Sequence, residues 1–120
     1  STVASLNVSG NKYVGSTLKM EATANPQTDT LYKLWVCDRS TDTWTVLSDW
    51  SSKNSIDYVP KKAGRYTFTV HVKHKNSSNV NEDDYKSMDV NVASPKSTVA
   101  SLNVSGNKYV GSTLKMEATA

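Results

Sequence analysis

The sequence of 120 residues contains one cysteine (Cys37), one phenylalanine and two histidines. A single cysteine excludes a disulfide within the chain, and its place in an apolar run is typical of a small buried residue. No apolar run approaches the roughly 18 residues of a membrane-spanning helix, so we expect no membrane span. Leu and Ala are sparse, whereas Val, Thr, Tyr and Trp recur, which favours β-structure.

Residues for catalysis or metal binding are equally scarce. His71 and His74 are an odd number of positions apart, which on a strand places them on opposite faces. Neither histidine stands in a catalytic or metal-binding motif, so we expect no enzyme activity and no cofactor. The acidic run at residues 81–84 offers oxygen ligands for Ca²⁺, but it lacks the ligand spacing of a dedicated loop. A solvated acidic loop is the favoured interpretation.

The net charge of +3 comes from lysines scattered along the chain. No basic stripe with interleaved aromatic residues is present, so we expect no nucleic-acid partner. Loose attraction to an anionic polymer, such as a bacterial cell-wall polymer, stays open as an alternative. A solvated, lysine-rich surface is the favoured interpretation.

Residues 97–120 repeat residues 1–24 letter for letter. The chain therefore holds one full repeat of 96 residues and the opening of the next, which is typical of an array of small modules. We expect a module at residues 1–93, a linker at 94–96, and the truncated start of a second repeat at 97–120.

Short alternating stretches separated by turn residues indicate an all-β chain. The predicted strands are residues 2–8, 17–24, 31–37, 43–47, 56–59, 65–74 and 84–92. Seven strands of this spacing predict an immunoglobulin-like antiparallel β-sandwich, followed by the first two strands of the next repeat. Gly64-Arg65-Tyr66 sits at a strand start after Pro60, so we expect the Tyr66 hydroxyl to bond back to nearby backbone as a tyrosine corner.

These residues resemble a known family. The segments Tyr32-Lys33-Leu34 and Gly64-Arg65-Tyr66, together with Trp44 and Tyr58, follow the order and spacing of the triple-tyrosine (three-Y) domain. The resemblance covers about residues 31–75, and it implies that the three tyrosines of the name are Tyr32, Tyr58 and Tyr66. Such domains occur as tandem repeats in secreted clostridial cell-wall and surface proteins, including amidase-type autolysins.

The resemblance implies a non-catalytic, extracellular unit at the bacterial cell wall or surface. In that role it would act as a spacer, a structural unit or an adhesive unit, with neighbouring repeats as partners. The alternative is a module that binds carbohydrate or cell-wall glycan. Trp35 and Trp50, if they share an outer face, would form an aromatic platform for sugar rings. Packing of these rings against loops, the linker or a neighbouring module is favoured over sugar binding, and Trp44 is expected to pack on the sandwich.

The second copy of the repeated segment has a further implication. In an immunoglobulin-like sandwich, a chain leaving residue 92 must travel back about 20 Å to re-enter as the first strand. The four residues 93–96 span at most about 14 Å, so the first copy should complete its own module. The second copy then exposes unpaired strand edges, and we expect self-association or strand exchange between chains through residues 97–120.

Overall fold

A computed structural model describes residues 1–78, 80–95, 101–105 and 115–119. These residues form strands and no helix. The described part of the chain therefore holds no helix that could cross a membrane. The strands are β1 (Thr2–Ser9), β2 (Leu18–Asn25), β3 (Thr30–Asp38), β4 (Thr43–Ser51), β5 (Ser55–Tyr58), β6 (Gly64–His74), β7 (Asp84–Val92), β8 (Ser101–Ser105) and β9 (Lys115–Thr119).

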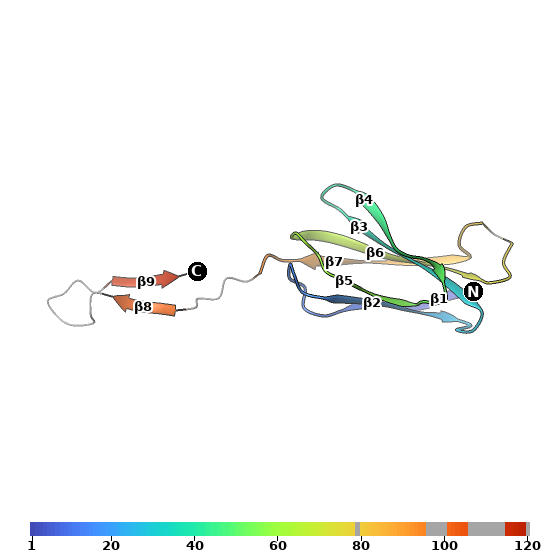
Figure 1. Cartoon of the computed structure of the whole chain (residues 1–120), viewed down its shortest axis with the longest axis horizontal. Coiled ribbons are helices and arrows are strands. Elements are labelled where there is room, and N and C mark those ends of the chain that lie inside the picture. Colours follow the sequence, from blue (N-terminus) through green and yellow to red (C-terminus); the bar gives the residue numbers. More distant parts are fainter. Residues whose placement is uncertain (79, 96–100, 106–114, 120) are drawn as a thin grey trace.

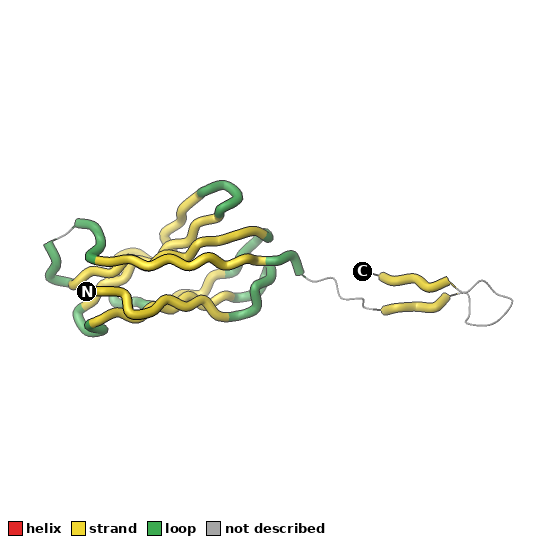
Figure 2. The backbone as a smooth tube through the Cα atoms, turned by 180° about the vertical axis from the view of Figure 1, so that it is seen from behind, coloured by secondary structure: helices red, strands yellow, loops and turns green. Residues whose placement is uncertain are grey.

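Strands β1 to β7 build two antiparallel sheets that face each other (Figures 1 and 2). One sheet has three strands in the order β1-β2-β5, and the other has four in the order β4-β3-β6-β7. The chain crosses between the sheets after β2, β4 and β5, and such crossings are typical of immunoglobulin-like sandwiches. The predicted all-β, immunoglobulin-like fold of about seven strands is therefore confirmed.

The core lies between the sheets and follows the alternation of the sequence. Every second residue of β2 and β6 turns inward, because successive side chains of a strand point to opposite faces. The fully buried side chains of these two strands include Leu18, Met20, Ala22, Phe68, Val70 and Val72. From β3, Tyr32, Leu34 and Val36 complete the facing layer.

Strand β4 is longer than the sequence predicts. It continues through residues 48–51, in which Trp50 is the one apolar residue and no period-2 alternation appears. Its register against β3 shifts between Tyr32 and Leu34, and again between Leu34 and Trp35. An irregular register allows a strand to continue without a period-2 pattern. The predicted strand ends at residue 47 because the apolar–polar alternation stops there.

The expected tyrosine corner is present. Gly64 opens β6 with a φ of 144°, a backbone conformation that favours glycine. Two residues later, the buried Tyr66 hydroxyl donates a 2.6 Å hydrogen bond to the backbone carbonyl of Lys62. The bond fixes the segment that carries the chain from β5 in one sheet to β6 in the other.

The second copy of the repeated segment pairs as the first one does. Strands β8 and β9 are antiparallel, with Val104 opposite Met116, and the corresponding Val8 and Met20 are partners in β1 and β2. The same sequence therefore selects the same hairpin register twice. Residues 96–100, 106–114 and 120, which include part of the predicted linker and of the second copy, lie outside the described residues.

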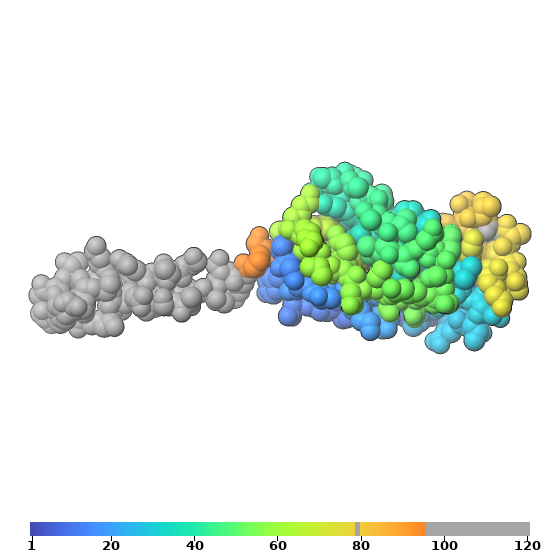
Figure 3. Space-filling model, viewed as in Figure 1, coloured from blue at the N-terminus to red at the C-terminus, as the bar shows by residue number. Residues whose placement is uncertain are grey.

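The chain enters the sandwich at one end and leaves it at the other (Figures 1 and 2). The space-filling view shows the orange segment that follows β7 at the end where the chain leaves (Figure 3). We call the leading end the one formed by Ser1 with the loop residues 26–29, 52–54, 75–78 and 80–83. The trailing end is formed by the loops 10–17, 39–42 and 59–63 with Ala93. Ser1 Oγ is 2.8 Å from Thr30 Oγ1 at the leading end, whereas the Ala93 nitrogen donates to the Lys12 carbonyl at the trailing end.

Candidate binding face

The outer surface of the four-stranded sheet carries an aromatic groove. It has a volume of about 360 Å³ and is lined by Trp35, Trp44, Thr69 and His71. These residues come from β3, β4 and β6, which are neighbours in the sheet. The groove is therefore built on paired strands rather than on loops.

Strand pairing places the lining residues side by side. On β3, Trp35 alternates with core residues, so its ring turns outward. Its direct partner on β6 is Thr69. On β4, Trp44 lies opposite Cys37, two residues from Trp35 on the same face. Diagonal neighbours of this kind are within reach of large aromatic side chains.

The rings contact one another edge to face. The centroids of Trp35 and Trp44 are 6.4 Å apart with the ring planes at 87°. The imidazole of His71 lies 5.6 Å from Trp35 and 6.1 Å from the ring of Tyr85. Trp44 keeps 44% of its surface exposed, so its ring is the part of the groove most open to a ligand.

Two cations flank the tryptophans. The Lys33 ammonium lies 4.6 Å from the Trp35 ring centroid and 3.7 Å from an Asp49 carboxylate oxygen. The Arg39 guanidinium lies 5.2 Å from the Trp44 ring centroid. Cation–π contacts of this geometry hold the rings in place and give the groove a polar rim.

His71 is held in its neutral form. Burial lowers the pKa of His71, the Glu82 carboxylate opposes this effect, and the nearby Lys33 ammonium adds to it. The distance from His71 Nδ1 to Glu82 Oε2 is 3.8 Å. A pKa below the ordinary value of about 6.5 leaves the imidazole uncharged at neutral pH, so it contributes an apolar wall to the groove.

Polar atoms inside the groove are few. Thr69 Oγ1 is paired with Ser87 Oγ at 2.7 Å, and not with His71. Within the described part of the chain, Trp35 Nε1 is the one buried side-chain nitrogen or oxygen without a hydrogen-bond partner. The groove therefore offers mainly ring surface, which suits stacking rather than proton transfer.

The predicted pair of tryptophans does not form one platform. Trp35 lines the groove, but Trp50 lies apart from it, beneath the Lys73 ammonium at 4.5 Å from the ring centroid. The second tryptophan of the groove is Trp44. It packs on the outside of the sandwich, against Trp35, and not in the core.

Sequence reasoning missed three of the four lining residues. The signal for Trp44 was the short polar turn at residues 39–42, which sets Cys37 opposite Trp44 in a hairpin. Thr69 and His71 occupy outward positions of β6, because they alternate with the buried Phe68 and Val70.

The other candidate residues have structural surroundings. His74 ends β6, where its Nδ1 accepts a hydrogen bond from the Asn76 backbone nitrogen. Asp83 accepts from the backbone nitrogen of His74, and Asp84 accepts from that of Val3. The acidic run is thus hydrogen-bonded to the protein, in place of the solvated loop that we expected. No cluster of three or more His, Cys, Asp or Glu residues suited to a metal occurs in the described residues.

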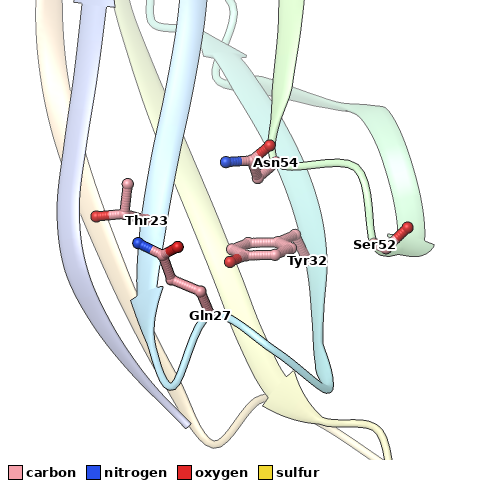
Figure 4. A pocket seen from close by; sticks show the side chains of 5 residues that line it. All are labelled: Thr23, Gln27, Tyr32, Ser52 and Asn54. Atoms are coloured by element: carbon pink, nitrogen blue, oxygen red, sulfur yellow. The ribbon is translucent and has the colours of Figure 1, made fainter.

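A smaller polar pocket of about 220 Å³ lies towards the leading end (Figure 4). It is lined by Thr23, Gln27, Tyr32, Ser52 and Asn54. Asn54 extends the pairing of β2 with β5, because its backbone carbonyl accepts from Ala22 and its side-chain amide donates to the Ala22 carbonyl. Burial raises the pKa of Tyr32. Asn54, at least, thus has a structural role in joining β2 to β5.

The three tyrosines of the sequence resemblance belong to the core and its border. Tyr58 packs edge to face on Tyr66 at 5.9 Å and on Phe68 at 5.8 Å between ring centroids. Tyr32 and Tyr66 are buried, and Tyr58 is half-buried. Burial raises the pKa of all three hydroxyls, which is consistent with a structural role.

The fold and the site together define an immunoglobulin-like β-sandwich module with an aromatic outer face. Residues 29–93, from the turn before β3 to the end of β7, match the family model of the Y_Y_Y domain. The chain therefore belongs to the Y_Y_Y domain family. Comparisons with curated proteins and with solved structures gave no match.

Proposed function

We propose that the protein is a non-catalytic, extracellular tandem-repeat module that acts as a spacer in a bacterial cell-wall or surface protein. The observation that carries this proposal is the placement of the two chain ends at opposite ends of the sandwich. Repeats joined in this way extend a chain in one direction, so each module adds its full length to the reach of the parent protein.

The contacts at each end support this arrangement. The Ser1 hydroxyl lies 2.8 Å from Thr30 Oγ1 at the leading end. Ala93 is hydrogen-bonded at the trailing end, to the carbonyl of Lys12 and the nitrogen of Val14. Because the chain is hydrogen-bonded at both ends of the module, a pull on the array would be carried along the strands. The repeated hairpin register of β8 and β9 supports a second module of the same kind.

A chain of two and then three complete repeats tests the spacer role by small-angle X-ray scattering. Strand β6 has 11 residues, which at about 3.3 Å per residue is about 36 Å. We expect the maximum dimension to grow by about 40 Å per added repeat. Growth by less than half of this value would mean that the modules fold back, and would contradict the proposal.

The second candidate function, glycan binding, is favoured by one observation: the groove with its exposed Trp44 ring. Tryptophan faces with a polar rim suit sugar rings, since they bury much area at low entropic cost. We infer that Trp44 would supply the stacking surface and Trp35 its support.

Retention of the chain on insoluble cell-wall glycan tests this candidate. We expect Trp44→Ala to reduce retention at least tenfold, whereas Trp50→Ala, outside the groove, is the matched control and should retain the protein like the wild type. Equal loss in both variants would argue against the groove. If the wild-type protein is not retained, glycan binding is contradicted and the spacer function is the one that still stands.

A further inference from the structure

We propose that successive repeats dock end to end, with the basic trailing end of one repeat against the acidic leading end of the next. The partner is thus a second copy of the module in the same chain. This inference rests on the proposed spacer function, because it needs a following repeat. It adds that successive repeats keep a fixed angle to each other instead of moving freely about the linker.

The covalent link keeps the two ends close together. The first module is hydrogen-bonded up to Ala93. The next repeat begins at Ser97, which corresponds to Ser1, and Ser1 is hydrogen-bonded into the leading end through its hydroxyl. From residue 93 to residue 97 the backbone spans at most about 14 Å. The facing surfaces therefore cannot separate far.

The trailing end is basic. Its loops, the end of β3 and the start of β6 carry two acids, Asp38 and Asp42, against five cations, which are Lys12, Arg39, Lys61, Lys62 and Arg65. Lys62 is paired with Asp38 at 3.0 Å, and Arg39 with Asp42 at 3.4 Å. Among the described residues, no carboxylate lies within ion-pair distance of Lys12 or Lys61. Both lysines are exposed.

The leading end is acidic. Its loops and the start of β7 carry four carboxylates, Asp29, Glu82, Asp83 and Asp84, against two lysines. Wherever another residue precedes the repeat in an array, the nitrogen beside Asp83 that corresponds to Ser1 belongs to a peptide bond and carries no charge. The leading end at such a junction therefore keeps its full excess of negative charge.

Apolar residues are exposed at both ends as well. Tyr13 is 40% and Val59 is 36% exposed at the trailing end. Val80 is 86% exposed in the loop 75–83 of the leading end. In the part of the chain that the structure describes, three other large apolar side chains are exposed. They lie on β4 and β7 and are Trp44, Val46 and Tyr85. Contact between the ends would cover Val80 with Tyr13 and Val59, which adds a short-range term to the attraction.

The distances suit a salt-sensitive contact. The Debye length is about 30 Å at 0.01 M salt and about 3 Å at 1 M salt. The linker holds the facing ends about 14 Å apart or closer at the point where the chain passes between them, so their charges attract at low salt and are screened at high salt. The angle between successive repeats should therefore be well defined at low salt and variable at high salt.

The test is the distribution of distances between two spin labels, measured by pulsed electron paramagnetic resonance. The chain is continued through a complete second repeat, and Asn7→Cys is introduced in each repeat for labelling. Asn7 is exposed on β1, and the native Cys37 is fully buried, so it resists labelling. We expect a narrow distribution at 20 mM salt and a width at least twofold larger at 1 M salt.

Charge reversal supplies the matched control. Lys12→Glu with Lys61→Glu in the first repeat lies at the junction and should widen the low-salt distribution at least twofold. The same pair in the second repeat lies at the far end and should leave it unchanged. Widths that respond neither to salt nor to the position of the reversal would overturn end-to-end docking. A mean label distance far below one module length would instead overturn the spacer function.

Discussion

The Tyr66 hydroxyl donates a 2.6 Å hydrogen bond to the backbone carbonyl of Lys62, across the segment where the chain changes sheets. The same ring packs on Tyr58. The tyrosine thus joins the core to the crossover, and the loop 59–63 of the trailing end owes its position to this bond.

Removing the hydroxyl should destabilise the fold without creating a cavity. Tyr66→Phe loses one buried hydrogen bond and leaves the Lys62 carbonyl without this partner. We expect a loss of about 1 to 2 kcal/mol in the free energy of unfolding, measured by urea denaturation. Tyr85→Phe, at an exposed position, is the control and should change stability by less than about 0.5 kcal/mol. Equal effects would show that the corner bond adds nothing.

The sequence predicted most of the fold because alternation and turn residues coincide. Burial alternates cleanly in β2 and follows the predicted inward positions of β6, and the expected corner at Tyr66 is present. The end of β4 was not predictable from pattern alone. Residues 48–51, which are polar except for Trp50, join the strand through an irregular pairing with β3. This is an effect of tertiary context rather than of local sequence.

The groove was predicted less well than the fold. The alternation of β3 turns Trp35 outward, but the identity of its aromatic partner depends on which residues face each other across two strand pairs. The register that sets Cys37 opposite Trp44 and Trp35 opposite Thr69 is fixed by turn geometry and core packing together. A single sequence shows each strand's faces but not this register.

Two glycines of the first hairpin should differ in their tolerance of a side chain. Gly10 and Gly15 both have positive φ, 110° and 86°. A Cβ at Gly10 would lie 2.5 Å from the Thr17 carbonyl oxygen, whereas one at Gly15 would meet nothing within 4 Å. Gly15→Ala should cost about 1 kcal/mol from backbone strain. Gly10→Ala should cost clearly more, because the Thr17 backbone must also move.

Urea denaturation of both variants checks this difference. A smaller loss in Gly10→Ala than in Gly15→Ala would contradict the close approach of the Thr17 carbonyl to Gly10.

Asp84 should matter more than its place in an acidic run suggests. Its carboxylate accepts a 2.8 Å hydrogen bond from the Val3 backbone nitrogen, which ties β1 to β7. Asp84→Ala leaves this nitrogen unpaired, and we expect a loss of about 1.5 to 3 kcal/mol in unfolding free energy. Asp84→Asn keeps an acceptor oxygen and should lose less. Asp57→Ala, at an exposed position of β5, should change stability little.

Thermal or urea unfolding of these three variants separates the hydrogen bond from the charge. If Asp84→Ala were no worse than Asp57→Ala, the tie between β1 and β7 would be unimportant for the fold.

The imidazole of His71 should make stability depend on pH. Its pKa in the folded protein is lowered, chiefly by burial, below the ordinary value of about 6.5 that applies to the unfolded chain. The unfolded chain therefore binds a proton more readily than the folded one. The stabilisation is complete above about pH 6.5 and is lost as the pH falls through and below that value.

Unfolding free energies at pH 7.5 and pH 5.5 measure this contribution. His71→Gln removes the titrating group, so this variant should lose less stability on acidification than the wild type. Glu82→Gln removes the carboxylate that opposes the shift, which lowers the pKa of His71 further, so this variant should lose more. The two substitutions thus move the pH dependence in opposite directions from the wild type. A common pH dependence in all three proteins would mean that His71 is not linked to folding in this range.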